Sequence, residues 1–501
     1  MTTNEKPNEP TFEDAIAEIA DLAFAYGIRK VGGLDPREAS PEQTKRFLEA
    51  CHEGYALAQH RLVEELGRVE AATRAMKRIQ KEARRQRERE KSEAAARLLE
   101  NLHYQEMALR TIANGLAWVM LRDQRWVVRR LYQGRAPTAL SAANLESVIR
   151  EAGRINQDPR NFALITDLTS CVQLGDLLVI DFSRDPGIIY CIELKEGQKN
   201  CEILQFLDSF GRTGCPRAAC FFAEEQGEAG LKQAQRIARQ QIRAAEAMKI
   251  LETGEGVDPM SSKPIRIPDK IFQHETYDAE LEALVEGARI NGENVAVLED
   301  CLWVGAYDAG QAVFPSLMFK DHLHHVLLKR QDCLLPESPS DVTEELLQKQ
   351  VVPYPIADLR QAIITPTSRP LFLRELSRQT IIDLVLGRVL VYIYLDLDRF
   401  LARSQTRGLG GRWQTRRERG RIKPEGYFRP VGKAPAFERA GRTVFMGDGL
   451  IVKMVFDGIT VNSVLNELDA MLGADSFWSG RSSQASGLAP GGEVWRTNSD
   501  G

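Results

Sequence analysis

Residues 175–197, GDLLVIDFSRDPGIIYCIELKEG, decide the fold that the sequence predicts for its central region. Two apolar runs, 177–182 and 188–194, flank the sequence RDPG at 184–187. Proline presets the backbone φ angle and glycine accepts the left-handed conformation, so this tetrapeptide favours a tight turn. The whole stretch therefore predicts a β-hairpin.

Three charged residues meet at one end of this predicted hairpin. Pairing about the turn places Asp176 opposite Lys195, and Asp181 opposite Tyr190. Because side chains alternate along a strand, Glu193 and Lys195 share one face, and Asp176 arrives beside them from the partner strand. A carboxylate in a mostly apolar strand is costly unless a cation or hydrogen bonds compensate for its charge. Mg²⁺ would do so, because two carboxylates and the intervening backbone carbonyl supply half of its oxygen shell.

Asp176 followed by Glu193-Leu194-Lys195 on the next strand resembles the active site of the PD-(D/E)xK nuclease superfamily. The resemblance covers residues 135–255, where the expected elements follow in the order helix 142–155, strand 162–168, the two hairpin strands, helix 201–210 and strand 218–223. This order is that of the superfamily's α-β-β-β-α-β core, a restriction-endonuclease-like α/β fold. One departure is that Gly175 stands where the superfamily pattern has proline.

The resemblance implies a nuclease that hydrolyses phosphodiester bonds with Mg²⁺ or Mn²⁺. Asp176 and Glu193 would hold the metal, and Lys195 would position or activate the attacking water. Many members add a glutamate from the first core helix, which here is Glu146 or alternatively Glu151. DNA is favoured over RNA because most of the superfamily acts on DNA, and bacterial defence, including antiviral defence, or repair would be natural settings.

A second function class stays open, which is a nucleic-acid-binding or oligomeric scaffold that keeps a nuclease-like shape without cutting. A Glu-x-Lys triplet alone is weak evidence, because such pairs are common on solvated strands. The presence of all three motif residues favours an active site, since a decayed site is expected to have lost at least one. No phosphate-binding loop of the form G-x-x-x-x-G-K-[ST] occurs, so an ATPase or other activator would be a separate partner.

The composition is that of an ordinary globular protein with several domains. The 501 residues are 43% hydrophobic and 27% charged, and the net charge of −4 means that any attraction to nucleic acid must be local. The start MTTNEKPNEP lacks a signal-peptide pattern, and no apolar stretch is long enough to span a bilayer, so we expect a cytoplasmic protein without membrane contact. None of the eight cysteines forms a Cys-x-x-Cys pair, and we expect reduced thiols.

The chain is expected to divide into five regions, with proline-containing linkers at 252–269 and 333–341. They are a helical region at 1–105, the nuclease domain at 106–255, a small α/β segment at 256–340, an α+β domain at 341–475 and a disordered tail at 476–501. In the first region, apolar residues recur at steps of four and three, which predicts a coiled-coil seam of Leu62, Leu66, Val69, Thr73 and Met76. This seam predicts a homo-oligomer, and the alternative is a helix packed against its own domain.

Two stretches have the basic character that nucleic-acid backbones attract. Between 399 and 433, arginines outnumber acidic residues and aromatic residues are interleaved, which suits phosphate contact and base stacking. Arg403 and Arg407 belong to this run, and the predicted contacts are Arg412, Arg416, Arg417, Arg419, Arg421 and Lys423. The alternative is a basic loop with another role. A predicted helix at 233–251 carries Arg236, Arg239, Arg243 and Lys249, which either line a phosphate track or form an ordinary solvated face.

Overall fold

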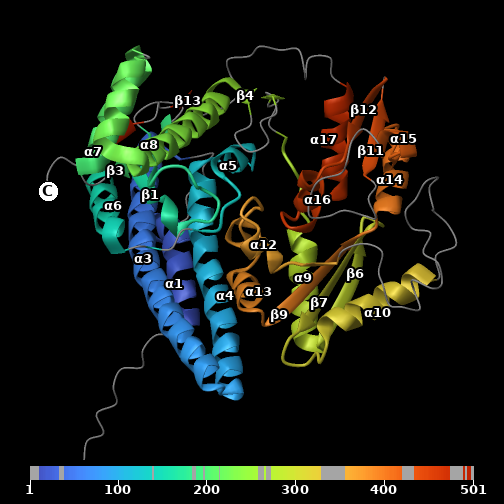
Figure 1. Cartoon of the computed structure of the whole chain (residues 1–501). Coiled ribbons are helices and arrows are strands. Elements are labelled where there is room, and N and C mark those ends of the chain that lie inside the picture. Colours follow the sequence, from blue (N-terminus) through green and yellow to red (C-terminus); the bar gives the residue numbers. More distant parts are fainter. Residues whose placement is uncertain are drawn as a thin grey trace, which may run out of the picture. The chain divides into compact units, whose positions relative to one another are not determined.

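The chain forms two units, each with helices packed on small sheets (Figure 1). Unit 1 comprises Met1–Asp269 and Ser482–Gly501, and unit 2 comprises Lys270–Arg481. The computed structural model describes residues 11–32, 39–123, 125–137, 140, 142–182, 188–195, 198–213, 215–257, 264–266, 272–328, 356–419, 434–439, 441–473, 489–490 and 494–497. Among the helices in these ranges, none combines the length and apolar character that a bilayer crossing requires.

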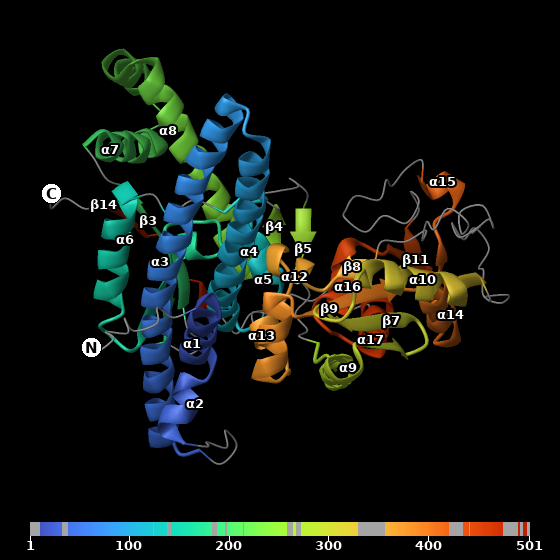
Figure 2. The same ribbon diagram turned by 90° about the horizontal axis from the view of Figure 1, so that it is seen from below.

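Unit 1 begins with a helical region, whose two longest helices lie side by side in Figures 1 and 2. Its helices are α1 (Phe12–Phe24), α2 (Tyr26–Val31), α3 (Pro41–Gln86) and α4 (Arg89–Met120). Helix α3 begins where the Ser40 side chain accepts the Gln43 N–H and Pro41 occupies the first turn, and it ends at Arg87 in the left-handed conformation. The helical N-terminal region is thus present.

The predicted apolar seam of α3 is used inside the unit. Leu62 and Leu66 are fully buried and Val69 is nearly so. From the same helix, the Gln59 amide donates to the Ala163 carbonyl at 3.1 Å and accepts the Ile165 N–H at 2.8 Å. These contacts agree with the alternative of a helix packed against its own domain, and oligomerisation stays a prediction.

The central sheet of unit 1 contains the predicted hairpin. The elements are α5 (Arg125–Leu131), α6 (Ala142–Ile155), β1 (Asn161–Ile165), the 3₁₀ turn Thr166–Leu168, β2 (Leu177–Asp181) and β3 (Ile188–Lys195). The predicted helix at 142–155 is confirmed, and β1, β2 and β3 pair antiparallel in sequence order. Strands β13 (Ala489–Pro490) and β14 (Val494–Thr497) add to β3 in parallel, so these parts of the predicted disordered tail are strands. The rest of that tail lies outside the described residues.

The register of the hairpin differs from the prediction by two residues. Leu177 pairs with Ile192 and Asp181 pairs with Ile188, whereas the sequence analysis paired Asp181 with Tyr190. The ladder ends at the Leu177–Ile192 pair, so Asp176 lies one residue before it, and the predicted pairing of Asp176 with Lys195 is not part of it. A shift of two residues keeps every side chain on its face, so the alternation of apolar residues fits both registers equally well.

The predicted fourth core strand is wrong, because 218–223 belong to a helix. The elements that follow the hairpin are α7 (Gln198–Thr213), α8 (Pro216–Thr253), β4 (Glu255–Val257) and β5 (Pro264–Arg266). Phe222 is buried in a cluster with Ile203 and Ile237, and its ring stacks on Phe206. A proline at the first helical position marks the start of α8. A restriction-endonuclease-like core is therefore not confirmed.

The sheet of unit 2 joins strands from both sides of the predicted boundary at residue 340. Its order is β6-β7-β9-β8, and all of its pairs are antiparallel. The elements are α9 (Asp278–Asn291), β6 (Glu293–Leu298), β7 (Leu302–Asp308), α10 (Pro315–Leu328), β8 (Ala357–Asp358), α12 (Gln361–Ile364), the 3₁₀ turn Leu371–Leu373, α13 (Arg378–Leu386) and β9 (Val389–Leu395). The segments predicted as 256–340 and 341–475 thus share one sheet.

A second, smaller sheet of unit 2 follows β9. Its strand order is β10-β11-β12, again antiparallel. The elements are α14 (Leu397–Thr406), β10 (Arg412–Trp413), α15 (Arg416–Arg419), β11 (Pro435–Arg439), β12 (Arg442–Phe445), α16 (Asp448–Val455) and α17 (Val461–Gly473). The predicted basic run therefore starts in α14 and passes through this sheet.

Candidate functional site

Asp176, one of the two predicted metal ligands, lies beside β3, the strand that carries the other, Glu193. The Asp176 N–H donates to the Ile192 carbonyl at 2.7 Å, and Ile192 is also the partner of Leu177, so the regular ladder ends at Leu177. The Asp176 and Glu193 side chains are both half-buried. The structure therefore places Asp176 next to the β3 residue that follows Glu193, and the ladder itself does not contain an Asp176–Glu193 pair.

The Asp176 carboxylate also has a structural contact, because its Oδ2 accepts the Leu194 N–H at 2.5 Å. The chain reaches this geometry through Gly175, whose φ is +69°. A Cβ at Gly175 would lie 2.9 Å from the Ile192 carbonyl oxygen. Proline fixes φ near −65°, so it cannot adopt this conformation. A proline at position 175 would therefore not fit this backbone.

The remaining predicted site residues are less closely placed. Glu146 is exposed on α6, and Glu151 on the same helix pairs with Arg154 at 2.8 Å. Lys195 is the last residue of β3, and its side chain lies outside the described part. Among the described residues, no group of three or more His, Cys, Asp and Glu side chains could hold a metal. Mg²⁺ commonly binds through one or two carboxylates and keeps several waters, so the side chains of Asp176 and Glu193 are of the chemical type that it takes as ligands.

A second feature of unit 1 is a cavity of about 330 Å³, which we call the arginine pocket. It is lined by Arg135, Arg236, Arg239, Gln240 and Arg243. The four lining residues of α8 follow at positions i, i+3, i+4 and i+7, so they share one helix face. The sequence singled out the α8 arginines, but it gave no signal for Arg135, which lies about 100 residues earlier. Lys249, the fourth basic residue of the predicted face, does not line the cavity.

Gln173 anchors the segment that carries Arg135. Its side-chain oxygen accepts the N–H groups of Gln133 (2.8 Å) and Arg135 (3.1 Å), and its amide nitrogen donates to the Arg135 carbonyl (2.7 Å). The Gln173 N–H also donates to the Leu131 carbonyl at 2.9 Å. Gln173 is three residues before Asp176, so one loop carries both the anchor of the arginine pocket and the acidic residue Asp176.

Much of the predicted C-terminal basic run is engaged inside unit 2. Arg412 binds Glu418 through both terminal nitrogens, at 2.7 and 2.9 Å, and it also contacts Glu438. The Arg412 guanidinium holds the pKa of Glu418 at about 2, below its usual value of 4.5. Arg416 and Arg417 are exposed on α15, whereas the Arg419 side chain, Arg421 and Lys423 lie outside the described residues.

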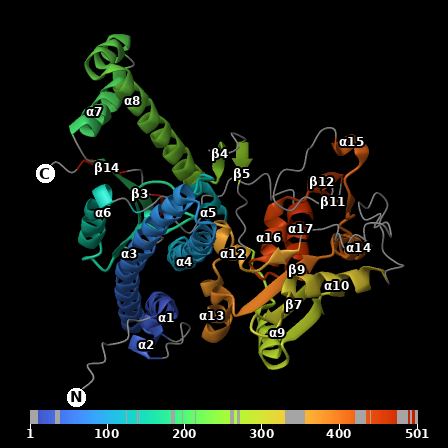
Figure 3. The ribbon, with the colours of Figure 1, turned by 60° about the horizontal axis from the view of Figure 1, so that its bottom comes forward.

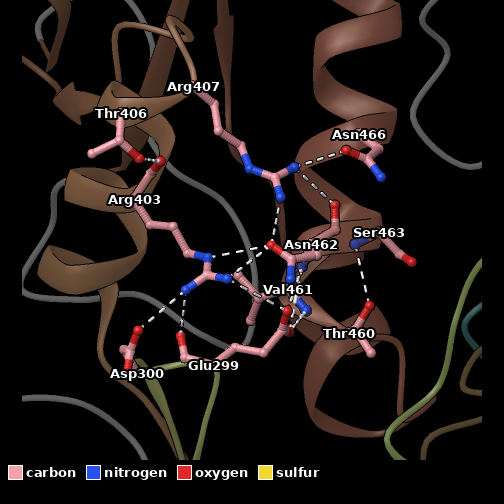
Figure 4. A network of polar contacts seen from close by, with 10 residues as sticks. All are labelled: Glu299, Asp300, Arg403, Thr406, Arg407, Thr460, Val461, Asn462, Ser463 and Asn466. Atoms are coloured by element: carbon pink, nitrogen blue, oxygen red, sulfur yellow. Dashed lines mark hydrogen bonds and ion pairs between the residues drawn. The ribbon is translucent and has the colours of Figure 1, made fainter.

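Arg403 and Arg407 tie α14 to the beginning of α17 (Figure 4). Arg403 donates to the Asn462 side chain at 2.9 Å and to the Glu299 carbonyl at 3.2 Å. Arg407 donates to Asn462 at 2.6 Å and to Asn466 at 2.7 Å. The Glu299 carboxylate accepts the first N–H groups of α17, which completes the network. These two arginines hold unit 2 together.

Comparison with known proteins identified no relative. No family model, curated protein or solved structure matches the chain.

Proposed function

We propose that unit 1 is a metal-dependent nuclease that hydrolyses phosphodiester bonds in nucleic acid, with DNA preferred to RNA. The observation that carries this proposal is that the half-buried carboxylate of Asp176 accepts the N–H of Leu194, the residue after the half-buried Glu193 on β3. The Asp176 and Glu193 side chains would hold Mg²⁺ or Mn²⁺, which when bound acidifies water and stabilises negative charge on a phosphate. Lys195 follows Glu193 by two residues on the same strand, so its position suits it to orient the attacking water.

A non-catalytic nucleic-acid-binding protein is the second candidate. The hydrogen bond from the Leu194 N–H to the Asp176 carboxylate favours it, because this contact gives Asp176 a structural reason to be an acid. The two candidates differ in the role of Glu193. In the nuclease, Glu193 is needed for cutting, whereas in the non-catalytic protein it has only a local structural role.

The test is cleavage of linear, circular and single-stranded DNA, and of RNA, by the full-length protein with Mg²⁺, Mn²⁺ or EDTA. Glu193→Gln keeps the size and hydrogen-bonding capacity of the side chain and removes its charge. We expect cutting only with metal and a fall of about 100-fold or more in Glu193→Gln, because a metal ligand contributes several kcal/mol at the transition state. The matched control is Glu293→Gln, an exposed strand residue of unit 2.

Each outcome separates the candidates. Metal-dependent cutting that is equally strong in Glu193→Gln and in the control places the active site elsewhere. No cutting by the unmodified protein on any of the substrates favours the non-catalytic candidate. Loss in Glu193→Gln alone supports the nuclease.

A further inference from the structure

The arginine pocket gathers positive charge that no ion pair among the described residues balances. Arg135, Arg236, Arg239 and Arg243 are exposed, and none of them forms an ion pair within the described ranges of the chain. Like charges a few ångströms apart repel, and the repulsion grows where protein displaces water from a cavity. An anion in the pocket would remove this repulsion and would gain charge-assisted hydrogen bonds.

The spacing of the arginines suits several phosphate groups in a row. With a rise of about 1.5 Å per residue, Arg236 and Arg243 are separated by about 10 Å along the α8 axis. A nucleic-acid strand carries a phosphate about every 3.4 Å along a duplex, so this length covers about three of them. Guanidinium groups bind phosphate oxygens in pairs, which a lysine cannot do.

Helix α8, which carries three of the arginines, is held in place by buried side chains of its own. Ile237, Ala244 and Ala247 of the same helix are buried in unit 1. The end of α8 packs near α5, as Figure 3 shows, and the segment after α5 is fixed by the Gln173 bonds described above. The pocket is therefore formed before any ligand arrives, which lowers the entropy cost of binding.

Gln240 adds a polar amide side chain to the lining of the arginine pocket. An amide can both donate and accept hydrogen bonds. Nucleotide units supply donors and acceptors beside their phosphates, from sugar hydroxyls and bases, so Gln240 suits a ligand of this class.

We propose that the arginine pocket binds the phosphate groups of a nucleotide-based ligand, which is either a nucleic-acid strand or a free nucleotide. The site consists of Arg135, Arg236, Arg239 and Arg243, with Gln240 as the polar contact beside them. This site does not include Asp176 or Glu193, and the proposal does not depend on the proposed nuclease activity.

The test measures binding in EDTA, so that no metal-dependent reaction takes part. The probes are a short fluorescein-labelled single-stranded DNA, followed by anisotropy at several salt concentrations, and ATP as competitor. Arg236→Gln/Arg243→Gln in the full-length protein should weaken DNA binding by about tenfold or more. The slope of log affinity against log salt should fall by about 1.4, because two phosphate contacts are lost from a single strand. Arg78→Gln/Arg97→Gln, which removes two exposed arginines of α3 and α4, should change neither quantity.

Two further variants keep the result interpretable. Arg236→Lys/Arg243→Lys retains the charge and should recover most of the salt slope, which a misfolded pocket would not do. Glu193→Gln should bind as the unmodified protein does, so failure of the nuclease proposal would leave this one standing. If ATP displaces the DNA, and if ATP binding is lost in Arg236→Gln/Arg243→Gln, the ligand is a free nucleotide. If ATP leaves DNA binding unchanged, the ligand is a nucleic-acid strand. Absence of binding to both probes, or equal losses in the pocket variant and the α3/α4 control, overturns the proposal.

Discussion

The two arginine-rich regions of this protein use their arginines in different ways. In unit 2, Arg403, Arg407 and Arg412 bind side chains and carbonyls of their own unit. In the arginine pocket of unit 1, four arginines share a cavity, and within the described ranges none has a carboxylate partner. Among the described residues, the region with more arginines in sequence thus has fewer of them available to an external anion. The positions of nearby acidic residues decide which arginines can bind a ligand.

This difference has an energetic basis. A nucleic-acid phosphate that binds Arg412 must first displace Glu418 and Glu438, whereas in the pocket it displaces only water. Arg416 and Arg417 are the exposed members of the C-terminal set and stay candidates for nucleic-acid contact. Substitutions of paired arginines should therefore act on stability, and substitutions of pocket arginines should act on binding.

The largest effect is expected at Arg374, a buried arginine of unit 2 that is paired with Asp278. Its side chain is fully buried, its Nε donates to Asp278 at 2.8 Å, and its guanidinium lies 5.4 Å from the Tyr277 ring centre. Arg374→Met should lower the free energy of unfolding of unit 2 by about 3–5 kcal/mol, because Asp278 is left buried without a counter-ion. Native-state hydrogen exchange of peptides from β7 and β9 measures this quantity separately from unit 1.

The double variant Asp278→Asn/Arg374→Met is the control for this prediction. Removing both charges should cost less than the sum of the two single changes, since no unpaired charge remains. A cost below about 1 kcal/mol for Arg374→Met would mean that the pair contributes no more than an exposed one.

Arg412→Gln should have an intermediate effect. The change removes charge-assisted hydrogen bonds to Glu418 and Glu438, and such bonds contribute about 1.5–3 kcal/mol each when they are shielded. Because the Arg412 side chain is 28% exposed, we expect a loss near the lower limit, about 1.5 kcal/mol. Thermal unfolding of the full-length protein, followed by the fluorescence of the buried Trp413, measures it.

The pH dependence of the Arg412→Gln effect shows whether the ion pair is its source. Arg412 lowers the pKa of Glu418 to about 2 from 4.5, so the folded state binds this proton less readily than the unfolded state does. The stabilisation is therefore complete above the unfolded pKa and is lost as the pH falls through the folded pKa. The difference between the unmodified protein and Arg412→Gln should shrink as the pH falls from about 5 to about 2. A difference that does not change over this range would assign the effect to packing.

The sequence predicted the parts of unit 1 that depend on local pattern. It identified the helix at 142–155 and the β2/β3 hairpin, because periodicity and turn residues are properties of short segments. It missed the register, since a shift by two residues leaves the apolar alternation intact. It also assigned 218–223 to a strand, because a short apolar run fits a helix or a strand, and Pro216 was the signal that distinguishes them.

The candidate sites show the same limit. Asp176 and Glu193 could be found from sequence because they lie at one end of a single hairpin, directly before β2 and near the end of β3. Arg135 could not be found, because only the tertiary packing of α5 against α8 and the bonds from Gln173 bring it to the pocket. Likewise, nothing local shows that Glu438 of β11 is a partner of Arg412.

The smallest effect, and the one that tests the comparison most directly, is expected for Arg243→Gln in the arginine pocket. Arg239 and Arg243 are four residues apart on α8, and a like-charge pair at this spacing costs about 0.2–0.5 kcal/mol. The substitution should therefore raise the free energy of unfolding of unit 1 by about 0.3 kcal/mol at low salt, and salt should remove this gain by screening. Thermal unfolding at low and high salt, with Arg78→Gln as control, measures both parts. A loss of about 1 kcal/mol or more, as for Arg412→Gln, would mean that Arg243 is a paired structural arginine, and the contrast between the two regions would fail.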